Sequence, residues 1–315
     1  MTTASGWLDF LTSHYLDGYI AQGGSKVKFL IGPAPGKTEF LKDLVRRARD
    51  KGYEAAYVDL RSARLQQFQT LYGLAVAGIR VDEIVQDLAH ALIRRLGYDP
   101  SQIRGDGSFY GWAVGERQRV PEVLKREVID AMELVWREVS LAGSFRSAVF
   151  GLVLRRLGLL PASFEEERVL HAWLQAEPLR IAETRRFQIY QRINRYNARL
   201  MLKSLLHLIT FTGRKGLVVG LDNLDVLLER HPETGRRRYT RAGRDDAYES
   251  IRQLIDEIDA LPNTWFFFAG GQELLDDDLS GLRSYTALWL RIQEEVYSSR
   301  FNQFLDLVET PRLQW

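Results

Sequence analysis

Short apolar runs alternate with amphipathic segments along the chain, a pattern typical of mixed α/β proteins. The runs are five to seven residues long and rich in valine, leucine and phenylalanine, as in strands buried on both faces. They predict strands at Lys26–Ile31, Glu54–Leu60, Gly216–Leu221 and Thr264–Ala269, with a shorter one near Phe304–Val308. Apolar positions at helical spacing predict helices at Gly6–Ala21, Thr38–Asp50, Asp245–Leu261 and Arg283–Tyr297.

Helical periodicity dominates between the second and third predicted strands. The clearest segments are Val81–Leu96, Pro121–Val139, Gly143–Leu157 and Phe187–Leu208. We therefore expect a sheet domain formed by residues 1–80 and 212–315, with residues 81–211 as a helical insertion or subdomain. Because the first strand, its helix and the second strand form a βαβ unit, the sheet should be parallel with both faces covered.

Composition excludes several classes of protein. Among 315 residues, 45% are hydrophobic, which is enough for a full core, and there is no cysteine for a disulfide scaffold, iron–sulfur cluster or thiolate zinc site. The five histidines lack metal-ligand spacing. A net charge of +2 means that only a local basic cluster could argue for nucleic acid. Without a long apolar run or a signal-peptide pattern, we expect a cytoplasmic protein with no membrane partner.

A glycine-rich loop follows the first predicted strand and leads into a helix. Its sequence, Gly32-Pro33-Ala34-Pro35-Gly36-Lys37-Thr38, has the position and chemistry of a P-loop. In that reading the backbone at Gly32 and Gly36 surrounds phosphates, Lys37 reaches phosphate oxygens and Thr38 binds Mg²⁺. The loop is one residue shorter than G-x-x-x-x-G-K-[ST], and its prolines have no N–H to donate, so weaker or altered phosphate binding follows. The alternative is a simple strand-to-helix turn.

The third predicted strand ends in a second polar motif. Asp222-Asn223-Leu224-Asp225 follows an apolar run, as in the Walker B arrangement, where the first carboxylate holds Mg²⁺. The next residue usually supplies the carboxylate that activates water, but Asn223 cannot accept a proton as a base. Asp225, two residues further along, is a candidate replacement. A strand that simply ends in a turn-forming Asp is the alternative.

Longer segments resemble one known family, the P-loop ATP-binding proteins of bacterial BREX-type phage-defence systems (BrxC/BrxD-like, of the AAA+/RecA-like class). The resemblance extends over nearly the whole chain. Family members typically have a full Walker A loop, a glycine at the position of Ala176, and Asp-Glu at the position of Asp222-Asn223. The segments that carry the resemblance are FLIGPAPGKTEFLKDL (29–44), AWLQAEPL (172–179), YNARLMLKSLLHLI (196–209), GLVVGLDNLDVLLER (216–230), AYESIRQLIDEID (247–259) and FFFAGGQELLDDDLSGLRSYTALWLRI (266–292).

The resemblance implies a P-loop NTPase fold, AAA+-like, with ATP and Mg²⁺ as cofactors. It implies phosphate contact by Lys37 and Mg²⁺ ligation by Thr38 and Asp222. It further implies a polar sensor at Gln272 and an arginine finger at Arg291, acting across a subunit interface. Arg283 and Arg300 are lesser candidates for the finger. Other defence-system subunits and a homo-oligomer are the implied partners.

A basic cluster follows the Walker B-like segment and makes DNA a candidate partner. Arginine forks bind phosphate, and the only acid within the segment is Glu233. A solvated loop is the alternative. The candidate nucleic-acid contacts are Arg236, Arg237, Arg238, Arg241 and Arg244, in a loop predicted for residues 231–244 and preceded by Arg230.

These observations favour an ATP-binding, AAA+-like subunit of an anti-phage defence system that hydrolyses ATP slowly or not at all. Nucleotide would switch an oligomer or a partner complex between states. Two alternatives remain open at this point: a nucleotide-independent pseudo-ATPase scaffold, and a remodelling ATPase stimulated by DNA.

Overall fold

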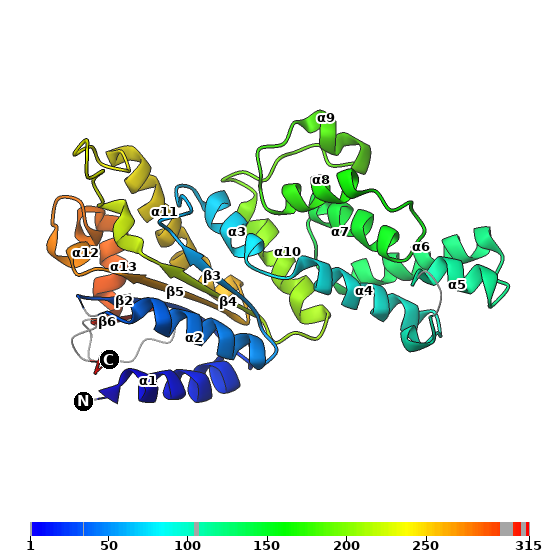
Figure 1. Ribbon diagram of the computed structural model, residues 1–315, viewed down its shortest axis with the longest axis horizontal. Coiled ribbons are helices and arrows are strands. Elements are labelled where there is room, and N and C mark those ends of the chain that lie inside the picture. The colour runs from blue at the N-terminus through cyan, green and yellow to red at the C-terminus, as the bar shows by residue number, and fades with distance from the viewer. Residues whose placement is uncertain (1, 34, 104–106, 297–304, 310–312, 315) are drawn as a thin grey trace. The chain divides into compact units, whose positions relative to one another are not determined.

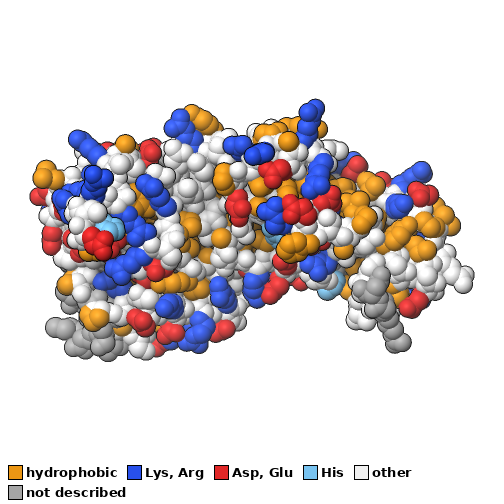
Figure 2. Space-filling model, turned by 45° about the horizontal axis from the view of Figure 1, so that its top comes forward, with side chains coloured by type: hydrophobic (Ala, Val, Ile, Leu, Met, Phe, Trp, Pro, Cys, Tyr) orange, Lys and Arg blue, Asp and Glu red, His pale blue; other side chains and the backbone are white. Residues whose placement is uncertain are grey.

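The computed structural model describes residues 2–33, 35–103, 107–296, 305–309 and 313–314. The chain forms two compact units, one of residues 1–79 with 214–315 and the other of residues 80–213. Basic and acidic side chains are interspersed over the face shown in Figure 2, in keeping with the small net charge. Within the described part, no helix is both long and apolar enough to cross a membrane.

A five-stranded parallel sheet, in the order β3-β4-β5-β2-β6, forms the centre of the first unit. The predicted strands and their parallel arrangement are confirmed. Every residue of β2, β4 and β5 is buried, as expected where helices cover both faces. The strands are β2 (Ser25–Ile31), β3 (Glu54–Asp59), β4 (Leu217–Asp222), β5 (Thr264–Gly270) and β6 (Leu305–Glu309). A separate parallel pair joins β1 (Thr2–Thr3) to β7 (Leu313–Gln314).

Helices cover the two faces of this sheet (Figure 1). On one face lie α1 (Ala4–Phe10), a π-helix (Leu11–Tyr19) and α2 (Lys37–Asp50). On the other lie α11 (Arg241–Glu257) and α13 (Thr286–Val296), while α3 (Phe68–Ala77) contacts β3 and α11. Short elements complete the unit: α12 (Glu273–Asp276) and 3₁₀ turns at Leu224–Leu227, Ile258–Ala260 and Leu282–Ser284.

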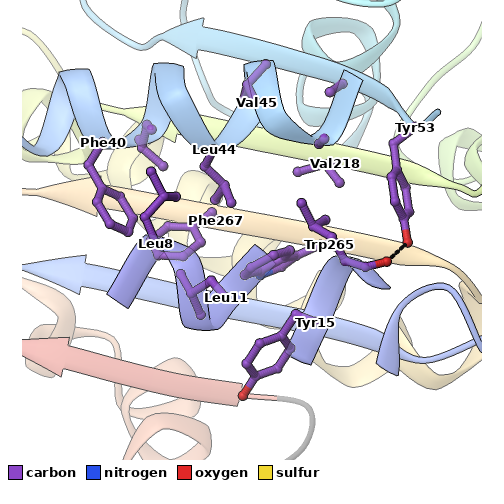
Figure 3. Packing of buried hydrophobic residues seen from close by; sticks show 14 of the residues in the cluster. Leu8, Leu11, Tyr15, Phe40, Leu44, Val45, Tyr53, Val218, Trp265 and Phe267 are labelled. Atoms are coloured by element: carbon purple, nitrogen blue, oxygen red, sulfur yellow. Dashed lines mark hydrogen bonds between the residues drawn. The ribbon is translucent and has the colours of Figure 1, made fainter. Parts of the chain in front are cut away.

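The core under α2 is built from aromatic and aliphatic side chains of the N-terminal helices and the sheet (Figure 3). Trp7 stacks on Phe40 with ring centroids 4.9 Å apart, and Phe267 of β5 packs beside both rings. A Cβ at Gly220 of β4 would meet Leu41 and Val45 at 3.4–3.8 Å, so α2 lies close to the strand. This packing fixes the first turn of α2 above the sheet, which matters for the site described below.

Several predicted helix boundaries differ from the structure. The helix expected at Gly6–Ala21 is α-helical only to Phe10 and then continues as the π-helix. Helix α11 begins at Arg241 rather than Asp245, because the Thr240 hydroxyl caps it by accepting from Gly243 N at 3.1 Å. Helix α13 begins at Thr286 rather than Arg283. Tyr297, Arg300 and Phe304 lie outside the described residues.

The second unit is helical, and its described residues contain no strand. The helix predicted at Phe187–Leu208 is wrong in its first half, since α10 begins only at Ala198. Asn197 explains this, because its side chain donates to Arg192 O and accepts from Asn194 N, which holds the preceding backbone in a turn. The helices are α4 (Val81–Arg95), α5 (Phe109–Gly115), α6 (Pro121–Glu138), α7 (Gly143–Arg156), α8 (Phe164–Leu174), α9 (Ile181–Thr184) and α10 (Ala198–Phe211), with 3₁₀ turns at Pro100–Gln102 and Arg185–Phe187.

Candidate functional site

The carboxyl ends of β2, β4 and β5 meet at one edge of the sheet. Strand β5 lies between the other two, with Ile31 of β2 opposite Gly270 and Leu221 of β4 opposite Phe268. The loop after β2 starts in contact with the end of β5, because Gly32 N donates to Gly270 O at 3.3 Å. In parallel α/β sheets ligands bind outside this edge, and the loop predicted as a P-loop lies there.

Helix α2 begins directly after the loop. Its N-cap is Gly36, with φ of +88°, a left-handed conformation that glycine adopts without strain. Phe40 N makes the first helical hydrogen bond, to Gly36 O at 2.9 Å, and Gly36 has no side chain with which to cap the helix. An uncapped helix N-terminus favours an anion through its first-turn amides and its dipole. Pro33 and Pro35 are both exposed on the loop.

Lys37 is half-buried at the start of α2. Its Nζ donates to Gly32 O at 2.6 Å, so the amine lies over the loop. Burial lowers the pKa of Lys37, and the charges of Asp225, Asp222 and Glu273 partly offset that effect. The amine therefore interacts electrostatically with these three carboxylates. Sequence reasoning did not identify Glu273, which lies at the start of α12.

The carboxylate of Asp222, at the end of β4, accepts three hydrogen bonds. Thr38 Oγ1 donates to Oδ2 at 2.6 Å, Tyr57 OH donates to the same oxygen at 2.8 Å, and Asn223 N donates to Oδ1 at 2.8 Å. Burial raises the pKa of Tyr57, and its bond to Asp222 adds to the shift. Sequence reasoning missed Tyr57 because nothing in the strand pattern shows that β3 is the neighbour of β4.

Asn223 adopts a left-handed conformation, with φ of +59°, which asparagine tolerates better than most residues. Strands β3 and β4 pair with Asp59 opposite Asp222, so the next residue can reach Asp59. Asn223 Nδ2 donates to Asp59 Oδ1 at 2.8 Å. The amide is thus engaged at the end of β3, and a carboxylate in its place would face another carboxylate.

Asp225 holds the ends of neighbouring strands together. Its Oδ1 accepts from Gly271 N at 2.9 Å, just after β5, and its Oδ2 lies 3.6 Å from the Arg61 guanidinium. Arg61 follows β3, and its own N–H donates to Asp59 Oδ1 at 2.9 Å. Asp225 therefore has a partner on each side, and its role as a replacement base stays a prediction.

Gln272 and Arg291, the candidate sensor and arginine finger that follow β5, form hydrogen bonds with residues outside the candidate site. Gln272 is the N-cap of α12, and its amide donates to Asp276 Oδ1 at 3.1 Å within that helix. Arg291 of α13 pairs with Asp256 of α11 through Nε, at 3.0 Å. Arg283 lies 3.3 Å from the Asp278 carboxylate. Arg300, the remaining finger candidate, lies outside the described residues.

The arginine-rich segment after β4 is partly ordered, in contrast to the open loop expected. Arg230 and Arg237 form an antiparallel bridge, and Arg238 donates to Arg61 O. Arg236 is exposed on this hairpin. Arg241 and Arg244 belong to α11, and Arg244 is only 4% exposed. Its assignment as a nucleic-acid contact is wrong, because burial in the core removes it from any surface.

The fold and this arrangement define a mixed α/β protein in which a lysine–threonine loop and an acidic strand end meet at one edge of a parallel sheet. The chain belongs to the family of BREX system ATP-binding proteins BrxC/D, whose family model matches residues 118–309. The resemblance noted in the sequence is confirmed. The match includes β4 with Asp222, while the loop at residues 32–38 precedes it. No curated protein and no solved structure matches the chain.

Proposed function

We propose that this chain is an ATP-binding subunit of a BREX defence assembly, acting in the cytoplasm with a P-loop NTPase core of AAA+-like type. Residues 1–80 and 212–315 form that core, and residues 81–211 are its helical insertion. Nucleotide binds at the carboxyl ends of β2, β4 and β5. Its partners are other subunits of the system or further copies of the chain, whose association the bound nucleotide changes.

The single observation that carries this proposal is the 2.6 Å contact between Thr38 Oγ1 and Asp222 Oδ2. The contact joins the first turn of α2 to the aspartate that ends β4. Hydroxyl and carboxylate oxygens are ligands that Mg²⁺ takes. Thr38 and Asp222 would hold the ion, directly or through water, and the ion would neutralise phosphate charge. Lys37 supplies the matching cation for the phosphates. The residues present thus fit ATP with Mg²⁺.

We further propose that hydrolysis is slow. Asn223 cannot act as a base, and its amide is bound to Asp59. Asp225 bonds to the end of β5 and pairs with Arg61. Binding without rapid turnover suits a switch, in which the nucleotide stabilises one state of an assembly. Gln272 remains the candidate sensor of the γ-phosphate, while Arg291 can act as a finger only in such an assembly, once it leaves Asp256.

Equilibrium binding of ATP in the presence of Mg²⁺ tests the proposal. We expect saturable binding to the wild type and its loss in Lys37→Ala. Arg46→Ala, on the exposed face of the same helix, is the matched control and should bind normally. If the wild type shows neither saturable binding nor a thermal shift, the chain is a nucleotide-independent scaffold. Rapid, motor-like turnover that Lys37→Ala abolishes would contradict slow hydrolysis.

Exposed Arg236 and Arg238 on the hairpin after β4 support a second candidate, a remodelling ATPase that DNA stimulates. The test is a salt titration of DNA binding by the wild type and by a variant with Arg236, Arg237 and Arg238 replaced by glutamine. We expect weaker binding and a smaller salt slope for the variant if the hairpin contacts DNA. Unchanged affinity and slope would remove DNA from this surface.

A further inference from the structure

A cavity of about 610 Å³ lies within the helical unit and has no part in the proposed function. One wall is a stripe of α6, where Glu133 and Arg137 are four residues apart and Trp136 lies beside them. A second wall is a stripe of α7 that includes Arg146 and Phe150. The 3₁₀ turn Arg185–Phe187 closes a third side. This volume falls within the range of roughly 300–1,000 Å³ that small-molecule pockets have.

The lining is strongly basic. It contains four arginines and a single acid, Glu133. Outside the lining, Glu166 pairs with two of the arginines, Arg155 and Arg186. The other two, Arg137 and Arg146, are exposed, and the described part of the chain offers them no ion-pair partner. Two guanidinium groups at the same cavity are therefore available to an anionic ligand.

Arg155 lines the cavity and has a donor without an acceptor in the described part of the chain. Its side chain is only 5% exposed. Nη1 donates to Gly151 O at 2.8 Å and Nη2 pairs with Glu166, but Nε is buried without a hydrogen-bond partner among the described residues. A buried N–H without an acceptor costs free energy. An acceptor atom on a bound ligand would relieve that cost.

Three aromatic rings line the same space. Phe187 is already engaged, since the guanidinium groups of Arg186 and Arg155 lie 4.9 Å and 5.6 Å from its centroid. Trp136 and Phe150 are half-buried, and neither has a ring partner among the residues that the structure describes. Flat rings beside cationic groups are how proteins bind a base together with its phosphate.

We propose that this cavity binds a nucleoside phosphate, with the base against Trp136 or Phe150 and the phosphate on Arg137 and Arg146. The nucleotide is either free or at the end of a single strand, since both present the same chemistry. This site is separate from the loop at Lys37. The helical unit is then a second nucleotide-responsive element of the protein and more than a spacer in the chain.

Equilibrium dialysis of the full-length chain against AMP tests the proposal, because AMP lacks the β- and γ-phosphates that a P-loop lysine contacts. We expect about one AMP bound per chain in the wild type and in Lys37→Ala alike. The double variant Arg137→Glu/Arg146→Glu should bind roughly tenfold more weakly or worse. Arg126→Glu, exposed on α6 three turns from Arg137 and outside the lining, is the matched control and should bind as the wild type does.

Two further measurements define the ligand. Quenching of tryptophan emission by AMP should disappear in Trp136→Phe if the base stacks on that ring, and should persist in Phe150→Leu. Competition by a 5′-phosphorylated oligo(dT) that exceeds competition by AMP identifies a strand end as the source, and the reverse identifies free nucleotide.

The proposal is overturned if neither probe binds saturably to Lys37→Ala, if charge reversal leaves affinity unchanged, or if inorganic phosphate binds as tightly as AMP. If ATP does not bind at the loop of Lys37, the proposed function fails, but the AMP binding expected at the cavity is unaffected.

Discussion

Thr38 and Asp222 are 184 positions apart in the chain, yet Thr38 Oγ1 lies 2.6 Å from Asp222 Oδ2. The helical unit is inserted between them in sequence. The contact exists because β5 lies between β2 and β4, and because α2 packs closely over Gly220 of β4. It joins the two motifs into the one site that we propose for a phosphate and its metal ion.

Replacing Thr38 by alanine removes that hydroxyl. Because Mg²⁺ is proposed to bind between Thr38 and Asp222, we expect Thr38→Ala to weaken Mg²⁺–ATP binding by roughly tenfold and to reduce the advantage of adding Mg²⁺. Thr38→Ser keeps the oxygen and should bind nearly as the wild type does. Isothermal titration of each variant with ATP, with and without Mg²⁺, measures the affinity and the advantage of adding Mg²⁺. Equal losses in the two variants would show that the hydroxyl is not a ligand.

Replacing Asn223 by aspartate changes charge at almost constant shape. The donor to Asp59 is lost and two carboxylates then lie close together, so we expect a loss of about 1–3 kcal/mol of unfolding free energy at pH 7. Urea unfolding at pH 7 measures the loss. The exchange Asp59→Asn with Asn223→Asp restores one amide facing one carboxylate and should recover most of the stability.

Ala176 ends helix α8 in a left-handed conformation, with φ of +59°. Ala176 N bonds to Trp173 O and Glu177 N to Ala172 O, which is the Schellman pattern that favours glycine at this position. We expect Ala176→Gly to stabilise the chain by about 0.5–1 kcal/mol, since glycine removes the steric strain. Thermal unfolding measures the shift. Gln175→Gly, one residue earlier where φ is −81°, should instead destabilise; the same sign for both variants would contradict the explanation.

Glu249 of α11 lies in a network with Arg252 and Tyr285. Hydrogen bonding to Arg252, opposed by burial and aided by Tyr285 and Gln253, lowers the pKa of Glu249 from 4.5 to about 2. A lowered carboxyl pKa contributes stability that is present above 4.5 and is lost as the pH falls towards 2. We therefore expect Glu249→Gln to cost about 1–2 kcal/mol at pH 7 and progressively less below pH 4.5.

Urea unfolding between pH 7 and pH 3 measures this dependence on the wild type and the variant. Glu165→Gln is the control, because Glu165 pairs with Arg168 on an exposed helical face and should have little effect. A difference between wild type and Glu249→Gln that stays constant across this range would show that the carboxylate contributes no pH-dependent stability.

The strands were the most predictable part of the fold. Lys26–Ile31 and Thr264–Ala269 differ from β2 and β5 by one residue each, because a strand buried on both faces shows as a continuous apolar run. Helix starts were less predictable. The start of α11 depends on the Thr240 cap, and the start of α10 depends on local bonds of Asn197, neither of which changes hydrophobic periodicity.

The sequence by itself determined a parallel α/β sheet, a lysine–threonine loop after its first long strand and an acidic end on a later one, because apolar runs and turn residues are properties of local segments. Only the tertiary structure decided that Tyr57 donates to Asp222, that Asn223 bonds to Asp59 and that Arg244 is buried. The partner of a polar side chain depends on which strands and helices are neighbours. That order is set by pairing and packing between segments far apart in the chain, which no local pattern records.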